Sequence, residues 1–334
     1  MKGTENEKKL WSSIKGLAEA YDDPYTTFFP PKEAKEFEME ISGNFEGVGM
    51  EVGVKDEVLT VIAPLKGTPA EKAGVEAGDK ILQIDETPTY NLTIDEAVDM
   101  IRGEKGTEVV LTVAREGESE TIEIPITRGV IQIPTIDTEL RNDGVFVISL
   151  YNFSGNATSA FEEALKEFVE TDSEKLILDL RGNPGGYLQA AVEMASYFLD
   201  SGEVVVRETG RGGEEVEVYR SKGYDIFDQE LDMVVLVNRG SASASEILAG
   251  ALSENNVATL VGEKTFGKGS VQEVVEITPE TSLKVTIAKW LTPNGVSFSE
   301  EGLTPDVEVE LNSDELNSGN DKQMERAVEL LLEN

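Results

Sequence analysis

Strand-like and helix-like segments alternate along the second half of this chain, and this alternation is the strongest constraint on its fold. In order, these segments are 145–150, 157–169, 175–180, 188–199, 233–238 and 244–253. The strand-like runs are short and apolar, whereas the helix-like segments repeat apolar residues at helical spacing. Leu176–Leu178 and Val234–Val237 are apolar enough for central parallel strands buried on both faces. We therefore predict a mixed α/β core that binds ligands at the carboxyl ends of its strands.

A different pattern occupies residues 43–128, where short alternating runs are separated by turns and two brief helices. The predicted strands are 47–52, 58–62, 80–84 and 109–113, and the predicted helices are 69–74 and 93–102. This pattern predicts a small β-rich unit placed before the α/β core.

Helical segments are predicted at both ends of the chain, at 7–21 and from Pro31 at the start, and at 322–332 after a polar, acidic linker. We accordingly divide the chain into four parts. They are an N-terminal helical region (1–42), the β-rich unit (43–128), the α/β core (129–311) and a C-terminal linker and helix (312–334).

The chain contains neither histidine nor cysteine, which limits the catalytic mechanisms and metal sites that it can form. Ser-His-Asp triads, thiol nucleophiles and metal sites built on histidine or cysteine are excluded. Proton transfer must therefore use lysine, aspartate, glutamate or tyrosine. We expect no metal and no organic cofactor.

The net charge of −36 comes from 65 acidic and 29 basic residues. A surface with this much negative charge repels phosphate backbones and acidic membranes. We therefore expect no nucleic-acid partner. No apolar run approaches the roughly 18 residues of a membrane span. The first residues also lack the apolar core of a signal peptide.

A serine stands at a helix start directly after the predicted buried strand 233–238. The segment reads Arg239-Gly240-Ser241-Ala242-Ser243-Ala244-Ser245-Glu246. Backbone N–H groups at a helix start are unpaired and the helix dipole is positive there, so an oxyanion would be stabilised and Ser243 could be a nucleophile. Ser243 and Glu246 also fit a capping box, S-x-x-E, which explains the serine without any chemistry.

A glycine-rich loop that follows a predicted strand at 258–261 carries a lysine. It reads Gly262-Glu263-Lys264-Thr265-Phe266-Gly267-Lys268-Gly269-Ser270, and its glycines permit close approach of the backbone. A lysine beside a serine in a dry pocket, its pKa lowered toward about 7 to 8, can be the general base that histidine supplies elsewhere. A solvated loop lysine is the alternative interpretation, because lysine side chains are rarely buried.

The same loop nearly fits a phosphate-binding motif, which makes nucleotide hydrolysis a rival function. Gly262-x-x-x-x-Gly267-Lys268 matches a Walker A motif up to its last position. Residue 269 is glycine where serine or threonine should hold magnesium, and the Walker-B-like strand ending at Asp179 precedes the loop. Both departures argue against a nucleotide hydrolase.

A third segment, Asp179-Leu180-Arg181-Gly182-Asn183-Pro184-Gly185-Gly186, follows the other predicted buried strand. Its glycines could present N–H groups to a reacting carbonyl and complete an oxyanion hole with the amide beside Ser243. An ordinary strand-to-helix turn is the alternative interpretation.

Together these segments resemble the carboxyl-terminal processing peptidases, also called tail-specific proteases. The resemblance covers nearly the whole chain, and its motifs come in the family's order. The matching segments are 22–25, 43–49, 179–186, 241–246, 265–272 and 302–306. The resemblance implies a ClpP/crotonase-like α/β peptidase core with an inserted PDZ domain at 43–128 and helical terminal segments.

The resemblance also implies roles for individual residues. Ser243 matches the family's nucleophile, Lys268 its general base, and Gln272 the glutamine one helical turn beyond the lysine, which orients the amine. The amides of Gly185 or Gly186 and of Ala244 would hold the oxyanion.

In the implied PDZ domain, Gly47-Val48-Gly49-Met50 matches the loop that captures a peptide's terminal carboxylate while the peptide adds a strand to the sheet edge. Met50 and Val52 would line the apolar pocket for the last side chain. Arg102 matches an arginine that couples tail capture to the active site in relatives; a charge at a helix C-terminus is its alternative explanation.

The predicted function is therefore that of a serine endopeptidase with a Ser-Lys pair, which captures free, apolar carboxyl ends and cleaves unfolded or tagged proteins near them. The competing class is a peptide-binding PDZ scaffold on an inactive peptidase body. The resemblance further implies export from the cytoplasm, with a signal or anchor that this sequence lacks, and a homodimer formed through the terminal helices. The sequence itself names no regulatory partner protein.

Overall fold

The computed structural model describes residues 5–21, 23–42, 44–55, 58–65, 67–115, 117–132, 135–210, 212–227, 231–299, 301–310 and 320–333. Its contacts divide the chain into two compact units, one formed by residues 1–43 and 134–334 and the other by residues 44–133. Asp22, Gly43 and residues 312–319 of the predicted linker lie outside the described residues.

The larger unit is built on a six-stranded sheet with the order β10-β11-β12-β15-β16-β19. The strands are β10 (Ile136–Leu140), β11 (Phe146–Leu150), β12 (Lys175–Asp179), β15 (Asp232–Val237), β16 (Thr259–Gly262) and β19 (Val307–Glu308). Strand β10 is antiparallel to β11, and all other neighbours are parallel. The predicted mixed α/β core is confirmed.

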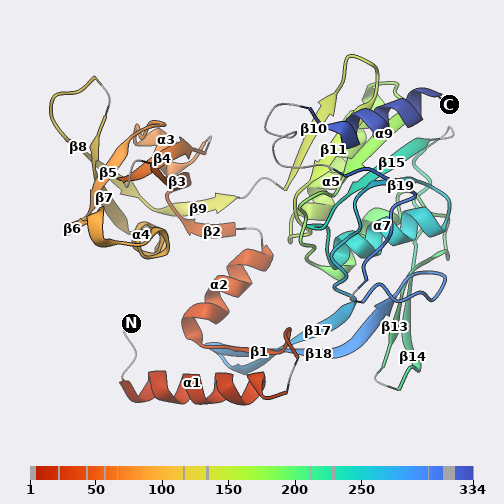
Figure 1. The fold of residues 1–334 in the computed structure, drawn as a ribbon, viewed down its shortest axis with the longest axis horizontal. Coiled ribbons are helices and arrows are strands. Elements are labelled where there is room, and N and C mark those ends of the chain that lie inside the picture. Colours follow the sequence, from red (N-terminus) through yellow and green to blue (C-terminus); the bar gives the residue numbers. More distant parts are fainter. Residues whose placement is uncertain are drawn as a thin grey trace. The chain divides into compact units, whose positions relative to one another are not determined.

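Helices cover both faces of this sheet (Figure 1). They are α5 (Ala157–Glu170), α6 (Leu188–Ala195) and α7 (Ala244–Glu254) on one face and α9 (Lys322–Glu333) on the other. Side chains alternate along β12, where Leu176 and Leu178 join the cluster under the first three helices and Ile177 joins the cluster under α9. The central strands are thus buried on both faces, as predicted.

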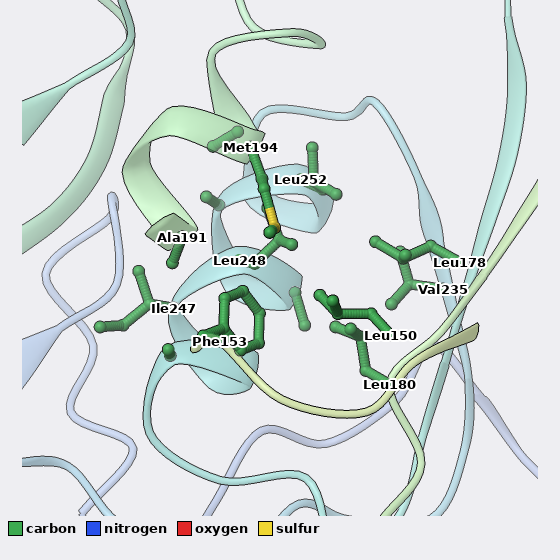
Figure 2. Close-up of a cluster of buried hydrophobic side chains, with 14 of the residues drawn as sticks. Leu150, Phe153, Leu178, Leu180, Ala191, Met194, Val235, Ile247, Leu248 and Leu252 are labelled. Atoms are coloured by element: carbon green, nitrogen blue, oxygen red, sulfur yellow. The ribbon is translucent and has the colours of Figure 1, made fainter. Parts of the chain in front are cut away.

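Figure 2 shows the core between the sheet and the helices α6 and α7. Leu178 and Val235 come from adjacent strands and face Leu248 and Leu252 of α7, while Met194 of α6 closes the cluster. This packing fixes α7, and therefore the turn that leads into it, against the carboxyl ends of β12 and β15.

A second sheet in the same unit has the order β1-β18-β13-β14, with β17 paired to β18. Its strands are β1 (Thr27–Phe29), β13 (Val204–Thr209), β14 (Glu215–Arg220), β17 (Ser270–Thr278) and β18 (Thr281–Leu291). Helices α1 (Glu5–Glu19) and α2 (Pro31–Ser42) flank β1 in the sequence. Trp11 and Phe28 are in ring contact, which ties α1 to β1.

The smaller unit is β-rich and has its own hydrophobic core. Its sheet comprises β3 (Met50–Lys55), β4 (Val58–Pro64), β5 (Lys80–Ile84), β7 (Glu108–Ala114) and β8 (Ile122–Thr127), with β6 (Thr87–Pro88) beside β5. Helices α3 (Pro69–Lys72) and α4 (Ile94–Ile101), the short η1 (Thr89–Asn91) and a ribbon of β2 (Asn44–Gly47) with β9 (Gly129–Gln132) complete it.

Two predicted elements are wrong in detail. The strand predicted at 47–52 is divided, because Gly49 has φ +77° and its carbonyl accepts bonds from Leu65 N–H and the Thr68 hydroxyl instead of a neighbouring strand. The helix predicted at 188–199 ends at Ala195, where the Ser196 hydroxyl turns back to the Val192 carbonyl. Across the described ranges, every helix is too short or too polar to cross a bilayer.

Candidate active site

Ser243 occupies the sharp turn between β15 and α7. Its backbone has φ +55° and ψ −114°. A residue with a side chain rarely adopts this conformation, and such strain costs on the order of 1–3 kcal/mol and is typical of functional sites. Ser241 braces the turn, since its N–H donates to the Asn238 carbonyl (2.9 Å) and its hydroxyl to the Leu180 carbonyl (2.8 Å). We call residues 238–243 the serine turn.

Asn183 joins the serine turn to residues 179–186, which we call the glycine turn. Its buried backbone carbonyl accepts from Ala242 N–H (3.0 Å) and from the Ser245 hydroxyl (2.9 Å). Its side chain donates to the Leu150 carbonyl (2.7 Å) and accepts from Gly185 N–H (2.9 Å). The two turns follow adjacent parallel strands, so the site lies at the carboxyl edge that the sequence predicted.

Gly185 and Gly186 have φ +97° and +147°, and neither position tolerates a side chain. A Cβ on Gly185 would lie 2.8 Å from both Ser243 Cβ and Ala244 N, so the two turns touch there. A Cβ on Gly186 would lie 2.3 Å from the Phe153 carbonyl oxygen. The Gly185 N–H is used by Asn183, whereas the N–H groups of Gly186 and Ala244 have no acceptor among the described residues. These two amides are the ones available to a ligand.

Glu246 connects the serine turn to residues 263–269, which we call the lysine loop. Its fully buried carboxylate accepts four hydrogen bonds. Oε2 accepts from the backbone N–H groups of Ser243 (2.8 Å) and Lys268 (3.0 Å). Oε1 accepts from the Thr265 hydroxyl (2.6 Å) and Gly267 N–H (2.7 Å). The bond from Ser243 N–H is also one half of a capping box, so one glutamate serves both the helix and the site.

Burial raises the pKa of Glu246 above the ordinary value for glutamate. The four donors favour the carboxylate and work in the opposite direction, but they only partly offset the loss of water around the charge. The sequence marked Glu246 only as a capping residue, because the donors from the lysine loop lie about twenty positions downstream.

Lys268 is half-buried in the lysine loop, between β16 and β17. Its Nζ lies 5.8 Å from the centroid of the Tyr25 ring, within the roughly 6 Å range of cation–π contacts. Gln272 lies on strand β17, so the expectation that it stands one helical turn beyond Lys268 is wrong. Its Nε2 donates to Ser270 Oγ (3.2 Å), which leaves its carbonyl oxygen as the group suited to an amine. Glu246 Oε2 thus holds the backbone N–H groups of Ser243 and Lys268 on one carboxylate oxygen, and Gln272 follows Lys268 on the next strand.

Tyr25 was not singled out by its chemistry, although it lies in one of the family-like segments. Its N–H donates to Asp23 Oδ1 (3.1 Å), and the neighbouring Thr26 hydroxyl accepts from Thr286 N–H (3.2 Å). Thr286 is the register partner of Gln272. Strand β18 therefore holds the Tyr25 turn and the residues after Lys268 at the same place.

In the smaller unit, the loop Gly47-Val48-Gly49-Met50 connects β2 and β3. A Cβ on Gly49 would lie 2.5 Å from Thr68 Cβ, so only glycine fits there. Val48 is buried in the core, and Met50 and Val52 are partly buried against that core.

Arg102 follows α4 as its C-cap residue, and its guanidinium lies 5.4 Å from the centroid of the Phe45 ring. Gly47 packs against the same residue, because a Cβ built on it would lie 3.7 Å from Arg102 Cα. The predicted carboxylate loop and the predicted coupling arginine are therefore neighbours within one unit. No group of three or more acidic side chains in the described ranges is arranged to hold a metal ion.

Comparison with known families and proteins agrees with this architecture. Peptidase family S41 matches residues 144–309, and the PDZ domain matches residues 60–115. The carboxy-terminal processing protease CtpA of Bacillus subtilis is 36% identical over 308 residues, which cover 92% of this chain and 65% of that protein. The carboxyl-terminal-processing protease of Synechocystis sp. is 37% identical over 98% of this chain and 78% of its own length.

Solved structures give the same picture. The photosystem II D1 C-terminal processing protease matches with a TM-score of 0.59 and 29% identity, over 98% of this chain and 87% of that one. A putative S41 protease from Bacteroides fragilis has a TM-score of 0.60 at 16% identity, over 99% of this chain and 92% of that one, and shares the fold.

Proposed function

Since this chain belongs to peptidase family S41, among the carboxyl-terminal processing serine proteases, we propose that it is an endopeptidase whose catalytic pair is Ser243 and Lys268. Family membership confirms the resemblance drawn from the sequence, including the PDZ domain. The observation that carries the proposal is the shared acceptor Glu246 Oε2, which binds the backbone N–H groups of both residues. A loop lysine and a capping serine with no joint role would have no need of one common anchor.

In the proposed reaction, neutral Lys268 accepts the proton of the Ser243 hydroxyl while the oxygen attacks the scissile carbonyl carbon. The N–H groups of Gly186 and Ala244 stabilise the oxyanion. When the C–N bond breaks, the Lys268 ammonium returns its proton to the departing amine and an ester remains on Ser243. Lys268 then accepts a proton from the attacking water, and when the ester C–O bond breaks, the Lys268 ammonium returns this proton to Ser243 Oγ while the new carboxyl end departs. The carbonyl oxygen of Gln272 orients the amine.

The proposed substrates are unfolded proteins with a free, apolar carboxyl end. The loop Gly47-Val48-Gly49-Met50 would bind the terminal carboxylate through backbone N–H groups, and Met50 and Val52 would contact the last side chain. Arg102 would report tail binding to the peptidase. This chain spans 65% of the length of the Bacillus relative, so substrate and regulation are proposed for the part of the protein described.

The experiment that tests this function compares one unfolded protein with a free carboxyl end and the same protein with an amidated end. We expect cleavage of both, with a KM at least roughly 10-fold lower for the free end, because hydrogen bonds to a charged group are worth about 1.5–3 kcal/mol. A fluorophosphonate should label Ser243, as peptide mapping by mass spectrometry would reveal. Binding of the free end without cleavage or labelling would favour the scaffold.

Tyr25 gives a prediction about the base. Replacing Tyr25 with leucine is expected to lower kcat by roughly 10-fold, because the aromatic face that limits the position of the Lys268 amine is lost. Tyr25→Phe keeps that face and should retain nearly full activity. Steady-state kinetics at one pH would decide, and equal activity of the leucine and phenylalanine variants would contradict the role of the ring.

Two further expectations remain proposals. An extracytoplasmic location follows from the resemblance, and fractionation of the native cell would test it. We place the homodimer contact at α1, where Leu10 and Leu17 are 52% and 67% exposed, because Ala327, Val328 and Leu331 of α9 pack inside the same chain. Sedimentation of the purified protein at a monomer's mass would contradict the dimer.

A further inference from the structure

Arg181 of the glycine turn is bound by carboxylates from two distant parts of the chain. Its guanidinium is only 14% exposed and pairs with Asp179 (2.7 Å). Two parallel bonds, both 2.9 Å, join it to the carboxylate of Asp321, and a third contact reaches Gln323 Oε1 (3.2 Å). Burial opposes the charge, but the two carboxylates outweigh it and raise the pKa of Arg181, so the guanidinium stays charged. A buried guanidinium paired in this way holds the segments of both carboxylates, Asp179 and Asp321, in fixed positions relative to itself.

Asp321 is at the same time the residue that starts helix α9. Its Oδ1 accepts from Met324 N–H (3.0 Å), and its backbone carbonyl accepts from Glu325 N–H (2.9 Å). The helix is docked along its length, since Gln323 is buried and its Nε2 donates to the Val309 carbonyl (2.7 Å). Lys175 donates to the carbonyl of Leu331 near the other end.

The docking of α9 is also hydrophobic. Ala327, Val328 and Leu331 pack into the cluster on the face of the sheet opposite α7. Asp321 therefore stands on an element that cannot shift without exposing apolar surface.

From Arg181 the contacts lead directly to the reacting groups. The next residue, Gly182, donates its N–H to Asn238 Oδ1 (2.9 Å) in the serine turn. Asn183 follows, with its bonds to Ala242, Ser245 and Gly185. Movement of Arg181 would therefore displace the segment that carries the Gly186 amide and contacts Ser243.

We propose that Asp321 is a positioning residue for the oxyanion site, acting through Arg181 on the glycine turn. This inference rests on the proposed function, in which the Gly186 amide stabilises the transition state. Misplacement of a catalytic group by about 1 Å can cost roughly 100-fold in rate. Loss of the Asp321 charge should therefore lower kcat by about 10- to 100-fold and leave KM nearly unchanged, because tail capture belongs to the other unit.

The test compares Asp321→Asn, Asp321→Ala and Glu325→Gln in the full chain. Asparagine is as good a helix cap as aspartate, so Asp321→Asn removes the charge and keeps the cap, whereas alanine removes both. Glu325 is an exposed acid in the same helical turn, so Glu325→Gln is the control for a change of net charge. We expect a lower kcat for Asp321→Asn and wild-type kinetics for Glu325→Gln, with fractions folded verified by urea unfolding.

A readout independent of catalysis keeps the inference separate from the proposed function. Amide hydrogen exchange across residues 182–187 should be faster in Asp321→Asn than in Glu325→Gln. Equal exchange and equal kcat in these two variants would overturn the role of Asp321. A wild type that cleaves nothing, with exchange still accelerated in Asp321→Asn, would overturn the peptidase proposal and leave the link from α9 to the glycine turn intact.

Discussion

Replacing Ser243 or Lys268 with alanine is expected to lower kcat by about 10⁴-fold or more, because residues that act as one catalytic unit lose nearly everything when either is removed. Alanine at 243 leaves no oxygen to form the ester, and alanine at 268 leaves no amine to accept the proton. Tail binding should be unchanged in both variants. Single-turnover cleavage of an unfolded protein with a free apolar end would measure the loss.

The chain supplies matched controls for both substitutions. Ser253 lies near the other end of α7, and Lys264 is an exposed lysine of the lysine loop. Ser253→Ala and Lys264→Ala should therefore cleave at nearly the wild-type rate.

Because Lys268 must be neutral to accept a proton, the wild-type rate should also rise with pH. A rate that stays flat from about pH 5 to about pH 9, or cleavage that survives both alanine variants, would end the Ser-Lys proposal.

Replacing Glu246 with glutamine is expected to lower kcat by about 100-fold while changing the free energy of unfolding by less than about 2 kcal/mol. Glutamine has one acceptor oxygen and one NH2 group, so its NH2 group must face the N–H groups of Ser243 and Lys268 or the donors of Thr265 and Gly267. One pair of contacts is then lost, and Glu246 no longer holds the serine turn and the lysine loop together as firmly. Removal of a buried charge offsets part of the cost in stability.

The measurement is kcat beside urea unfolding, with Glu163→Gln on the exposed side of α5 as the control. The control should leave both quantities unchanged. A fall in kcat that only matches the unfolded fraction would make Glu246 a structural residue without a role in positioning.

The raised pKa of Glu246 gives this prediction a pH dependence with opposite signs for stability and activity. A raised folded-state pKa means that the contribution to stability is fully present below the unfolded-state value, about 4.3, and is lost as pH rises through the folded-state value. Acidification should therefore make the wild type more stable relative to Glu246→Gln, as measured by the difference between their free energies of unfolding. Activity should fall over the same range, because the four bonds need the carboxylate. A shift of the stability difference toward the variant would contradict the raised pKa.

Much of the fold could be predicted because local patterns determine it. Strands such as Leu176–Leu178 read as buried on both faces, and the alternation with helices predicted the parallel sheet. The positions of Ser243, Lys268 and Gly185 were also predictable, since each follows a strand of that sheet. The hairpin of β17 and β18 could not be predicted. Most of β17 is exposed, so apolar and polar residues alternate only weakly along it, and the strands that pair with the hairpin are distant in sequence.

The supporting contacts of the candidate site could not be predicted from the sequence. Asp321 and Arg181 are 140 positions apart, and no periodicity relates them. Glu246 fits a capping box so well that the motif hid its bonds to Thr265, Gly267 and Lys268. The division of the strand predicted at 47–52 depended on the left-handed conformation of Gly49, which follows from contacts with Thr68 rather than from the local pattern.

The distance along the chain between Arg181 and Asp321 has a consequence for biosynthesis. A nascent polypeptide that has left the ribosome as far as residue 310 already contains the serine, the lysine and the glycines of the site, but not the carboxylate that holds Arg181 from α9. In the proposed mechanism, full peptidase activity would then require that α9 has been synthesised. If the proposed role of Asp321 holds, a chain made only as far as residue 310 would be a weak hydrolase until α9 has been made and has docked.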